Sequence, residues 1–181
     1  MFKRILILVL LIFITACGGG SSDSSFVAVG TNPRVSECVN FGTVQNRIIS
    51  QLEEYYCSDE RLLWQYDEVS QTIHFLNKDV LLGCDAEFSI SILKDMKTGN
   101  YRIEEREDPG TVMEAVCLCF FDFEIDLNNP TTISDTIYVT LTRVINDYEY
   151  IGHEYIIWEG SLDLSDSEGD ILIEENVGFC D

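Results

Sequence analysis

The 181-residue chain carries 32 acidic and 11 basic residues, a formal net charge of −21, and 46% of its residues are hydrophobic. This hydrophobic content excludes a disordered acidic chain, because there is enough apolar surface to form a core. The charge argues against binding of nucleic acid or anionic lipid by bulk electrostatics, since their phosphates would be repelled, and it favours cations or basic protein surfaces as partners.

The N-terminus has the pattern of a secretory signal peptide. Lys3 and Arg4 precede an apolar run over residues 5–14, which is shorter than the ~20 residues that span a bilayer. The run leads into ITAC, residues 14–17, which resembles the lipobox of bacterial lipoproteins. The resemblance implies cleavage before Cys17 and acylation of its sulfur, which would anchor the protein to a membrane. The alternative is an ordinary signal peptide that leaves Cys17 as a free thiol.

Glycine and serine dominate the segment after this cysteine, which predicts a flexible tether. We assign residues 1–16 to the signal peptide, residues 17–34 to the lipidated cysteine and tether, and residues 35–181 to a single β-rich globular domain. By analogy with lipoprotein sorting in Gram-negative bacteria, Gly18 implies the outer membrane. Cleavage removes 16 of the 181 residues, two of them basic, so 165 remain and the net charge moves from −21 to −23. That length suffices for one domain with a core.

Six more cysteines follow, and an even number in an exported chain predicts disulfides. They are Cys38, Cys57, Cys84, Cys117, Cys119 and Cys180. We expect Cys38 to pair with Cys57 in a local loop. Cys84 and Cys180 then pair with the two cysteines of the CLC sequence, in some order, because residues i and i+2 of one strand lie too far apart to form a disulfide.

Helical periodicity is clearest over residues 43–56, where the apolar side chains fall on one stripe. After Asp59 the pattern changes to short strands separated by turns. The expected strands cover residues 61–66, 72–76, 80–84, 86–93, 101–107, 117–127, 136–145, 148–164 and 170–175. Roughly eight or nine strands at this spacing predict a mainly β fold, an antiparallel β-sandwich or barrel-like domain braced by disulfides, with one N-terminal helix.

The strand with the clearest alternation is CLCFFDFEIDL, residues 117–127. One face should carry Cys117, Cys119, Phe121, Phe123, Ile125 and Leu127. The other should carry Leu118, Phe120, Asp122, Glu124 and Asp126. With CDAEF, YRIEERED and YVTLT around it, the stretch over residues 80–145 resembles β-rich domains of bacterial lipoproteins that have CxC, an aromatic residue and then Asp. This resemblance implies the fold and carries no activity.

Two acidic clusters are candidate cation sites. Asp122, Glu124 and Asp126 should project from one strand face about 7 Å apart, and a divalent cation needs several carboxylate oxygens. The favoured alternative is a solvated face whose ion pairs run to Arg102 and Arg106 on a neighbouring strand.

The second cluster is DLSDSEGD, residues 163–170, which contributes Asp163, Asp166 and Asp170. It lacks the glycine at position 6 of an EF-hand loop. We expect it to turn a hairpin between two strands, with a weak Ca²⁺ loop as the alternative.

Neither histidine is assigned a catalytic role. His74 alternates with Ile73 and Phe75 and should face solvent, whereas His153 should pack among aromatic residues. Either could join the CLC pair in a zinc or copper site, but disulfides are favoured in an oxidising compartment. The chain contains no GxSxG, HExxH or phosphate-loop motif.

The sequence therefore predicts a lipid-anchored envelope lipoprotein that acts as a non-enzymatic binding or structural module, with no cofactor other than a possible Ca²⁺. One alternative is an envelope hydrolase with a carboxylate-based site. Another is a protease-inhibitor-like module that presents EDPGTVME, residues 107–114. An open pocket lined by acids of raised pKa favours the enzyme, and an exposed apolar patch favours the binding module.

Overall fold

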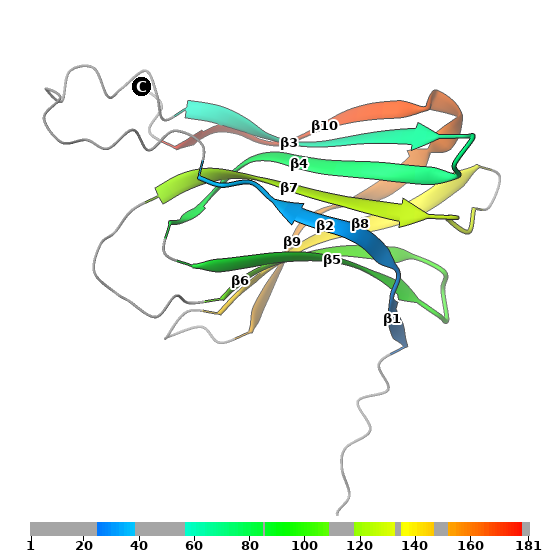
Figure 1. Cartoon of the computed structure of the whole chain (residues 1–181), viewed down its shortest axis with the longest axis horizontal. Coiled ribbons are helices and arrows are strands. Elements are labelled where there is room, and N and C mark those ends of the chain that lie inside the picture. Colours follow the sequence, from blue (N-terminus) through cyan, green and yellow to red (C-terminus); the bar gives the residue numbers. More distant parts are fainter. Residues whose placement is uncertain are drawn as a thin grey trace, which may run out of the picture.

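The computed structural model describes residues 25–38, 57–84, 86–108, 118–132, 135–146 and 152–178, which form two five-stranded sheets (Figure 1). Sheet A has the order β1 (Phe26–Ala28), β5 (Glu87–Asp95), β6 (Tyr101–Asp108), β8 (Thr136–Ile145), β9 (His153–Asp163). Sheet B has the order β10 (Glu168–Gly178), β3 (Cys57–Asp67), β4 (Thr72–Gly83), β7 (Leu118–Asn128), β2 (Gly30–Val35). The prediction of a mainly β, sandwich-like domain is confirmed. The signal peptide, Cys17 and the helix expected over residues 43–56 lie outside the described residues.

The tight β3–β4 hairpin forms where the sequence predicts it. Its turn places the Asp67 carboxylate against two backbone amides, with Oδ1 2.8 Å from the nitrogen of Val69 and 3.3 Å from that of Ser70. Hydrogen bonds from the Ser70 side chain and from these amides lower the pKa of Asp67. The loop between residues 76 and 80 is instead a β-bulge within a continuous β4, where the register to β7 shifts between Asn77 and Val80.

The pairing is antiparallel throughout both sheets except between β6 and β8, which run parallel with Tyr101 opposite Val139. The prediction of a purely antiparallel domain is therefore wrong at this pair. Its cause is the position of β7, which follows β6 in the chain but belongs to sheet B. The chain leaves sheet A after β6 and returns beside it in the same direction.

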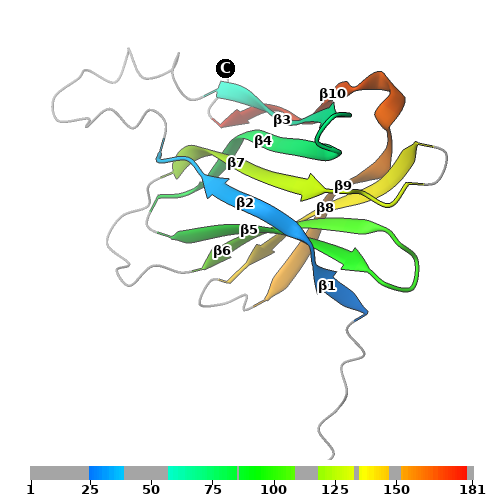
Figure 2. The ribbon, with the colours of Figure 1, turned by 45° about the vertical axis from the view of Figure 1, so that its right-hand side comes forward.

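Both sides of the sandwich are joined by chain that passes from one sheet to the other. At one side β1 pairs with β5 and the chain continues into β2, which pairs with β7 (Figure 2). At the other side the short 3₁₀ turn η2 (Leu164–Asp166) connects β9 of sheet A to β10 of sheet B. Such sheet-switching corners hold the two layers in register. The hairpin expected at residues 163–170 is wrong for this reason, because the flanking strands lie in different sheets.

Residues 26–28 and 30–35 form strands, although the sequence predicts a tether as far as residue 34. Val29 and Val35 pack against the core. The Arg102 guanidinium lies 4.4 Å from the centroid of the Phe26 ring, which fastens β1 to the outer face of sheet A. Val29 and Val35 thus give this segment contact with the core, while Phe26 remains 37% exposed.

The core lies between the two sheets, and it is built from the side chains that point inward at alternate residues of the strands. The predicted inward face of β7 is confirmed for its described residues, which are buried: Cys119, Phe121, Phe123, Ile125 and Leu127. The alternation of burial is interrupted at Phe120, which was expected on the opposite face and is also buried. The Phe88 ring of sheet A packs against Phe121 with the ring centroids 4.4 Å apart. Hydrophobic contact across the interface is therefore continuous along β7.

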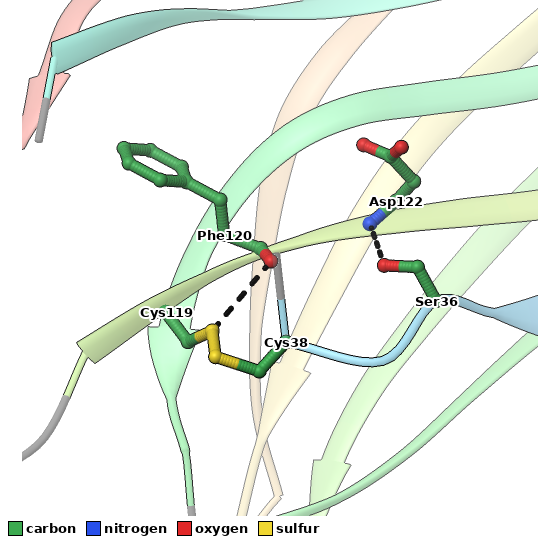
Figure 3. The surroundings of a disulfide bond; sticks show 5 residues. All are labelled: Ser36, Cys38, Cys119, Phe120 and Asp122. Carbon is green, nitrogen blue, oxygen red and sulfur yellow. Dashed lines mark hydrogen bonds between the residues drawn. A yellow bond between two sulfur atoms is a disulfide. The ribbon is translucent and has the colours of Figure 1, made fainter. Parts of the chain in front are cut away.

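A disulfide between Cys38 and Cys119 fastens the end of β2 to β7, with the Cα atoms 5.6 Å apart (Figure 3). Beside it, the Ser36 amide donates to the Asp122 carbonyl at 2.9 Å, and the Ser36 Oγ accepts from the Asp122 amide at 2.9 Å. The expected pairing of Cys38 with Cys57 is wrong, because β2 runs along β7 and carries Cys38 to Cys119. It follows that Cys119 does not bond to Cys84 or Cys180.

Candidate functional site

The outer face of sheet B contains an open groove of about 730 Å³ that lies over β3 and β4, between β10 and β7. Two cross-strand rows of residues form it. The strand register gives the first row as Asp170, Leu63, Leu76, Glu124 and Arg34, and the second as Glu168, Gln65, His74 and Asp126. All nine residues line the groove. Because residues opposite each other in an antiparallel pair point to the same face, the register alone brings them together.

In the first row the groove has an apolar floor between two acidic walls, whereas Gln65 and His74 lie at the centre of the second row. Leu63 of β3 and Leu76 of β4 are directly opposite each other and half-buried. The walls are carboxylates of the flanking strands, Glu124 and Asp126 on β7 and Glu168 and Asp170 on β10. The site therefore offers apolar contact between two rows of negative charge.

Surface cations already contact two of these carboxylates. The Arg34 Nη2 lies 2.6 Å from Glu124 Oε2, and the Arg61 Nη1 lies 2.7 Å from Asp170 Oδ1. The Glu124 and Asp170 side chains are 42% and 53% exposed. The hydrogen bond that Arg61 donates to the Asp170 carboxylate raises the pKa of Arg61. Because both carboxylates are about half exposed, they remain accessible to further donors.

A histidine and an aspartate form the polar centre of the second row. His74 Nδ1 lies 2.6 Å from Asp126 Oδ1, and Asn32 Nδ2 donates to Asp126 Oδ2 at 2.7 Å. Because an ionised carboxylate only accepts hydrogen bonds, Nδ1 carries the proton and Nε2 is left as the second polar atom of the ring. His74 is 51% exposed, as its alternation with Ile73 and Phe75 predicts.

Trp64 lies on the inner face of sheet B beside β10, where it is 6% exposed and belongs to the core. Its indole lies over Gly169, the residue opposite it in β10. A Cβ atom at residue 169 would collide with the indole Nε1 and Cε2 atoms. Glycine is therefore required at this position for the tryptophan to lie flat against the strand.

A second polar cluster lies in the core between the sheets. Glu60 of β3 and Glu105 of β6 both bind Arg143 of β8, whose Nη2 lies 2.7 Å from Glu60 Oε1 and 2.8 Å from Glu105 Oε2. Asn77 of β4 donates from Nδ2 to the same two carboxylates, at 3.0 and 2.7 Å. Two carboxylates thus share one guanidinium. Asn77 Oδ1 is buried and has no hydrogen-bond partner.

Burial raises the pKa of Glu105, and the guanidinium of Arg143 only partly offsets this effect. Burial also opposes the charge of Arg143, but the carboxylates of Glu105 and Glu60 outweigh it and raise the pKa of Arg143. The raised carboxyl pKa therefore belongs to a residue sealed in the core and not to the groove. We interpret this cluster as structural.

The predicted platform of Asp122, Glu124 and Asp126 is divided among protein partners. Asp122 Oδ1 accepts from the Asp79 amide at 3.0 Å and holds the bulge of β4, while Glu124 and Asp126 bind Arg34 and His74. The expected ion pairs to Arg102 and Arg106 are wrong, because β6 belongs to the other sheet. These arginines pair with Glu104 and Glu154 instead.

The acids of residues 163–170 are also separated from one another. Asp163 caps η2, with Oδ1 3.0 Å from the Ser165 amide and 2.7 Å from its hydroxyl, and these hydrogen bonds lower the pKa of Asp163. Asp170 points into the groove and Asp166 lies within η2. In the part of the chain that the structure describes, no three His, Cys, Asp or Glu side chains are placed to hold a metal ion.

The other predicted site residues have the following places. Cys57 and Cys84 are disulfide-bonded, whereas Cys117 and Cys180 lie outside the described residues. The sulfur of Cys119 is occupied by its disulfide, so the CLC pair with His74 or His153 offers no thiolate from that residue. His153 is exposed, with its ring centroid 6.2 Å from that of Tyr155. Most of the loop expected as an inhibitor segment, residues 109–114, lies outside the described residues.

The two leucines of the groove floor were not predicted from the sequence. The signal was present, because RLLWQY puts Leu63 on the strand face opposite Leu62 and Trp64, and TIHFL puts Leu76 on the face of His74. What the sequence lacked was the pairing that sets these outward leucines side by side between two acidic strands.

No family model matches the chain, and no curated protein or solved structure matches it. None of the described residues forms a helix long and apolar enough to cross a membrane.

Proposed function

We propose that this protein is a lipid-anchored envelope lipoprotein that acts as a non-enzymatic binding module, and that the groove of sheet B is its binding surface. The observation that carries the proposal is the apolar floor of Leu63 and Leu76 between the acidic walls. A floor that excludes water and a polar rim that fixes orientation are the general features of a binding surface.

The proposed localisation rests on the sequence. The ITAC sequence at residues 14–17 resembles a lipobox, and a lipidated Cys17 would leave the domain outside the cytoplasm. The disulfide between Cys38 and Cys119 fits this localisation, because disulfides persist in oxidising compartments. The outer membrane is favoured by Gly18.

A hydrolase is the less favoured function. His74 and Asp126 form the pair that could orient a general base, with 2.6 Å between Nδ1 and Oδ1. A hydrolytic site also needs a nucleophile or an activated water beside that base. The described hydrogen bond of the His74 ring runs to Asp126, and the neighbouring Gln65 and Leu76 supply no nucleophile.

The anchor is tested by fractionation of cells that express the full chain. Wild-type protein should sediment with membranes and label with a radioactive or clickable fatty acid. The Cys17→Ser variant should lose the label and leave the membrane fraction. Unchanged sedimentation without a label contradicts lipid anchoring through Cys17.

The binding role is tested by co-purification after cross-linking of intact cells that express the full chain. The double variant Leu63→Ser, Leu76→Ser removes the apolar floor without changing the charge. Tyr138→Ser is the matched control, since Tyr138 is a large exposed residue of sheet A. A partner recovered with wild type and control, but lost with the double variant, supports the proposal. Recovery of no partner by wild type, or of the same partners by all three proteins, contradicts it.

A further inference from the structure

We propose that the groove of sheet B binds a basic, extended polypeptide segment of a partner protein, with lysine or arginine at positions i and i+4 and an apolar side chain at i+2. This inference rests on the proposed function, since it names the class of partner for the same groove. The segment crosses the strands, so that its apolar side chain lies over Leu63 and Leu76 and its two cations reach the opposite walls.

The charge of the groove selects a cationic partner. Among the described residues, four carboxylates line it, namely Glu124, Asp126, Glu168 and Asp170, against one lining arginine, Arg34. The whole chain, including these residues, has a formal net charge of −21. This field attracts a basic segment and raises its rate of association. It also disfavours a second copy of this chain as the occupant, because two acidic walls would then face each other.

The spacing of the walls selects an extended segment. Asp170 on β10 and Glu124 on β7 belong to one cross-strand row and are separated by three strand-to-strand steps. At about 4.8 Å a step, the row spans about 14 Å. In an extended chain, residues i and i+4 point to the same side about 13 Å apart, and residue i+2 points to that side between them. The two cations of the segment can therefore reach Asp170 and Glu124, while the apolar side chain between them lies over Leu63 and Leu76.

The ion pairs already on the walls leave room for this partner. Arg34 and Glu124 are 69% and 42% exposed, and Arg61 and Asp170 are 36% and 53% exposed. A carboxylate has more lone pairs than one guanidinium uses, so it can accept an additional ammonium group. Among the described residues, none forms an ion pair with Glu168, which adds an uncompensated charge to the β10 wall.

The test uses the full-length protein in detergent and a fluorescent, acetylated and amidated heptapeptide with the sequence Ser-Lys-Ser-Leu-Ser-Lys-Ser. Binding is measured by fluorescence polarisation at low salt. Two control peptides separate charge from spacing. One replaces both lysines by glutamate, and the other keeps the composition but places the two lysines next to each other.

We expect the first peptide to bind, the glutamate peptide not to bind, and the peptide with adjacent lysines to bind at least about threefold more weakly, since only one wall is then reached. The double variant Glu124→Gln, Asp170→Asn should weaken binding of the first peptide by about tenfold. Glu87→Gln is the matched control because Glu87 is an exposed acid of sheet A, and it should leave the affinity unchanged. High salt should weaken binding in wild type.

No binding of the first peptide, or the same affinity in the wall variant, overturns the inference. The two proposals fail in different ways. If the floor variant Leu63→Ser, Leu76→Ser loses the cellular partner while the wall variant retains it, the groove is a binding surface for another class of ligand. If both variants retain the partner, the groove is not the binding surface.

Discussion

Arg143 of sheet A and Glu60 of sheet B form an ion pair in the core, with Nη2 2.7 Å from Oε1 and the Glu60 side chain 2% exposed. The same guanidinium binds Glu105, so two buried carboxylates depend on one cation. A buried pair of this kind adds little net stability compared with apolar residues, but removal of one partner leaves an uncompensated charge. The cluster therefore makes the packing of the two sheets sensitive to a few residues.

Replacement of Arg143 by methionine should destabilise the fold strongly. The variant leaves Glu60 and Glu105 buried without their cation, which typically costs about 3–5 kcal/mol of unfolding free energy. Urea unfolding of wild type and variant measures the loss. Arg106→Met is the matched control, because Arg106 is 37% exposed on the outer face of sheet A. If both variants lose the same unfolding free energy, removal of the buried guanidinium costs no more than removal of an exposed one.

Replacement of Glu105 by glutamine should change how stability depends on pH. Burial raises the pKa of Glu105 above its usual 4.5, so the folded protein keeps a proton that the unfolded chain has already released. The unfolding free energy then falls as the pH rises from about 4.5 to the folded pKa, because the unfolded state binds fewer protons there. This contribution is absent in the glutamine variant.

The measurement is urea unfolding of both proteins at several values between about pH 4 and pH 8. The stability of Glu105→Gln relative to wild type should increase with pH, because only the wild type loses the proton of residue 105 over this range. Glu87→Gln, an exposed control in sheet A, should differ from wild type by a constant amount. A constant difference for Glu105→Gln as well would mean that folding does not change the pKa of Glu105.

Loss of the disulfide between Cys38 and Cys119 should also destabilise the fold. The two cysteines are 81 residues apart in sequence, and closure of a loop of this length removes unfolded-state entropy worth about 4–5 kcal/mol. The double variant Cys38→Ser, Cys119→Ser should therefore unfold at much lower urea concentration than wild type. Ser36→Ala, which removes only the hydrogen bond to the Asp122 amide, should have a much smaller effect. A double variant as stable as Ser36→Ala contradicts the entropic argument.

The strand register predicts the other two disulfides. Cys57 and Cys84 are both disulfide-bonded. Gly83, the last residue of β4, is opposite Leu118, the first residue of β7. The residue after Gly83 is Cys84, and the residue before Leu118 is Cys117. Cys57 is opposite Gly178, two residues before the last cysteine of the chain. We therefore predict that Cys84 pairs with Cys117 and Cys57 pairs with Cys180.

Partial reduction, cyanylation and mass spectrometry of the unreduced protein check these pairs, because Cys117 and Cys119 remain on one proteolytic peptide. The method also tests whether denatured protein carries free thiols among the six cysteines of the domain, and none is expected. A peptide that links Cys57 to Cys84 would contradict the assignment.

Alternation of apolar and polar side chains was enough to predict most of the strands. The segments at 101–107 and 136–145 agree with β6 and β8 closely, and the inward face of β7 is as predicted. Two short strands were not predicted, because β1 and β2 carry few apolar residues and follow a Gly/Ser tract. Their stability comes from pairing with β5 and β7, which a local pattern does not contain.

The polar residues required the tertiary structure. Glu105 alternates with Arg106 in YRIEERE like any residue of a solvated strand, yet it points inward and is 1% exposed. Its partners Glu60 and Arg143 come from strands 45 and 38 residues away in the chain, and neither partner shows a sequence signal for burial. Burial of such a charge depends on the simultaneous presence of all its partners.

By itself the sequence determined the fold class, the strand periods, the even set of six cysteines after residue 17 and the acidic character of the surface. These properties are local or additive, so a single chain segment or a simple count reveals them. The division of strands between the sheets, the parallel β6–β8 pair, the partner of Cys38 and the rows of the groove were decided only by the tertiary structure. Each of them is a choice of neighbour between distant segments, and the free energy that makes the choice comes from packing the whole core.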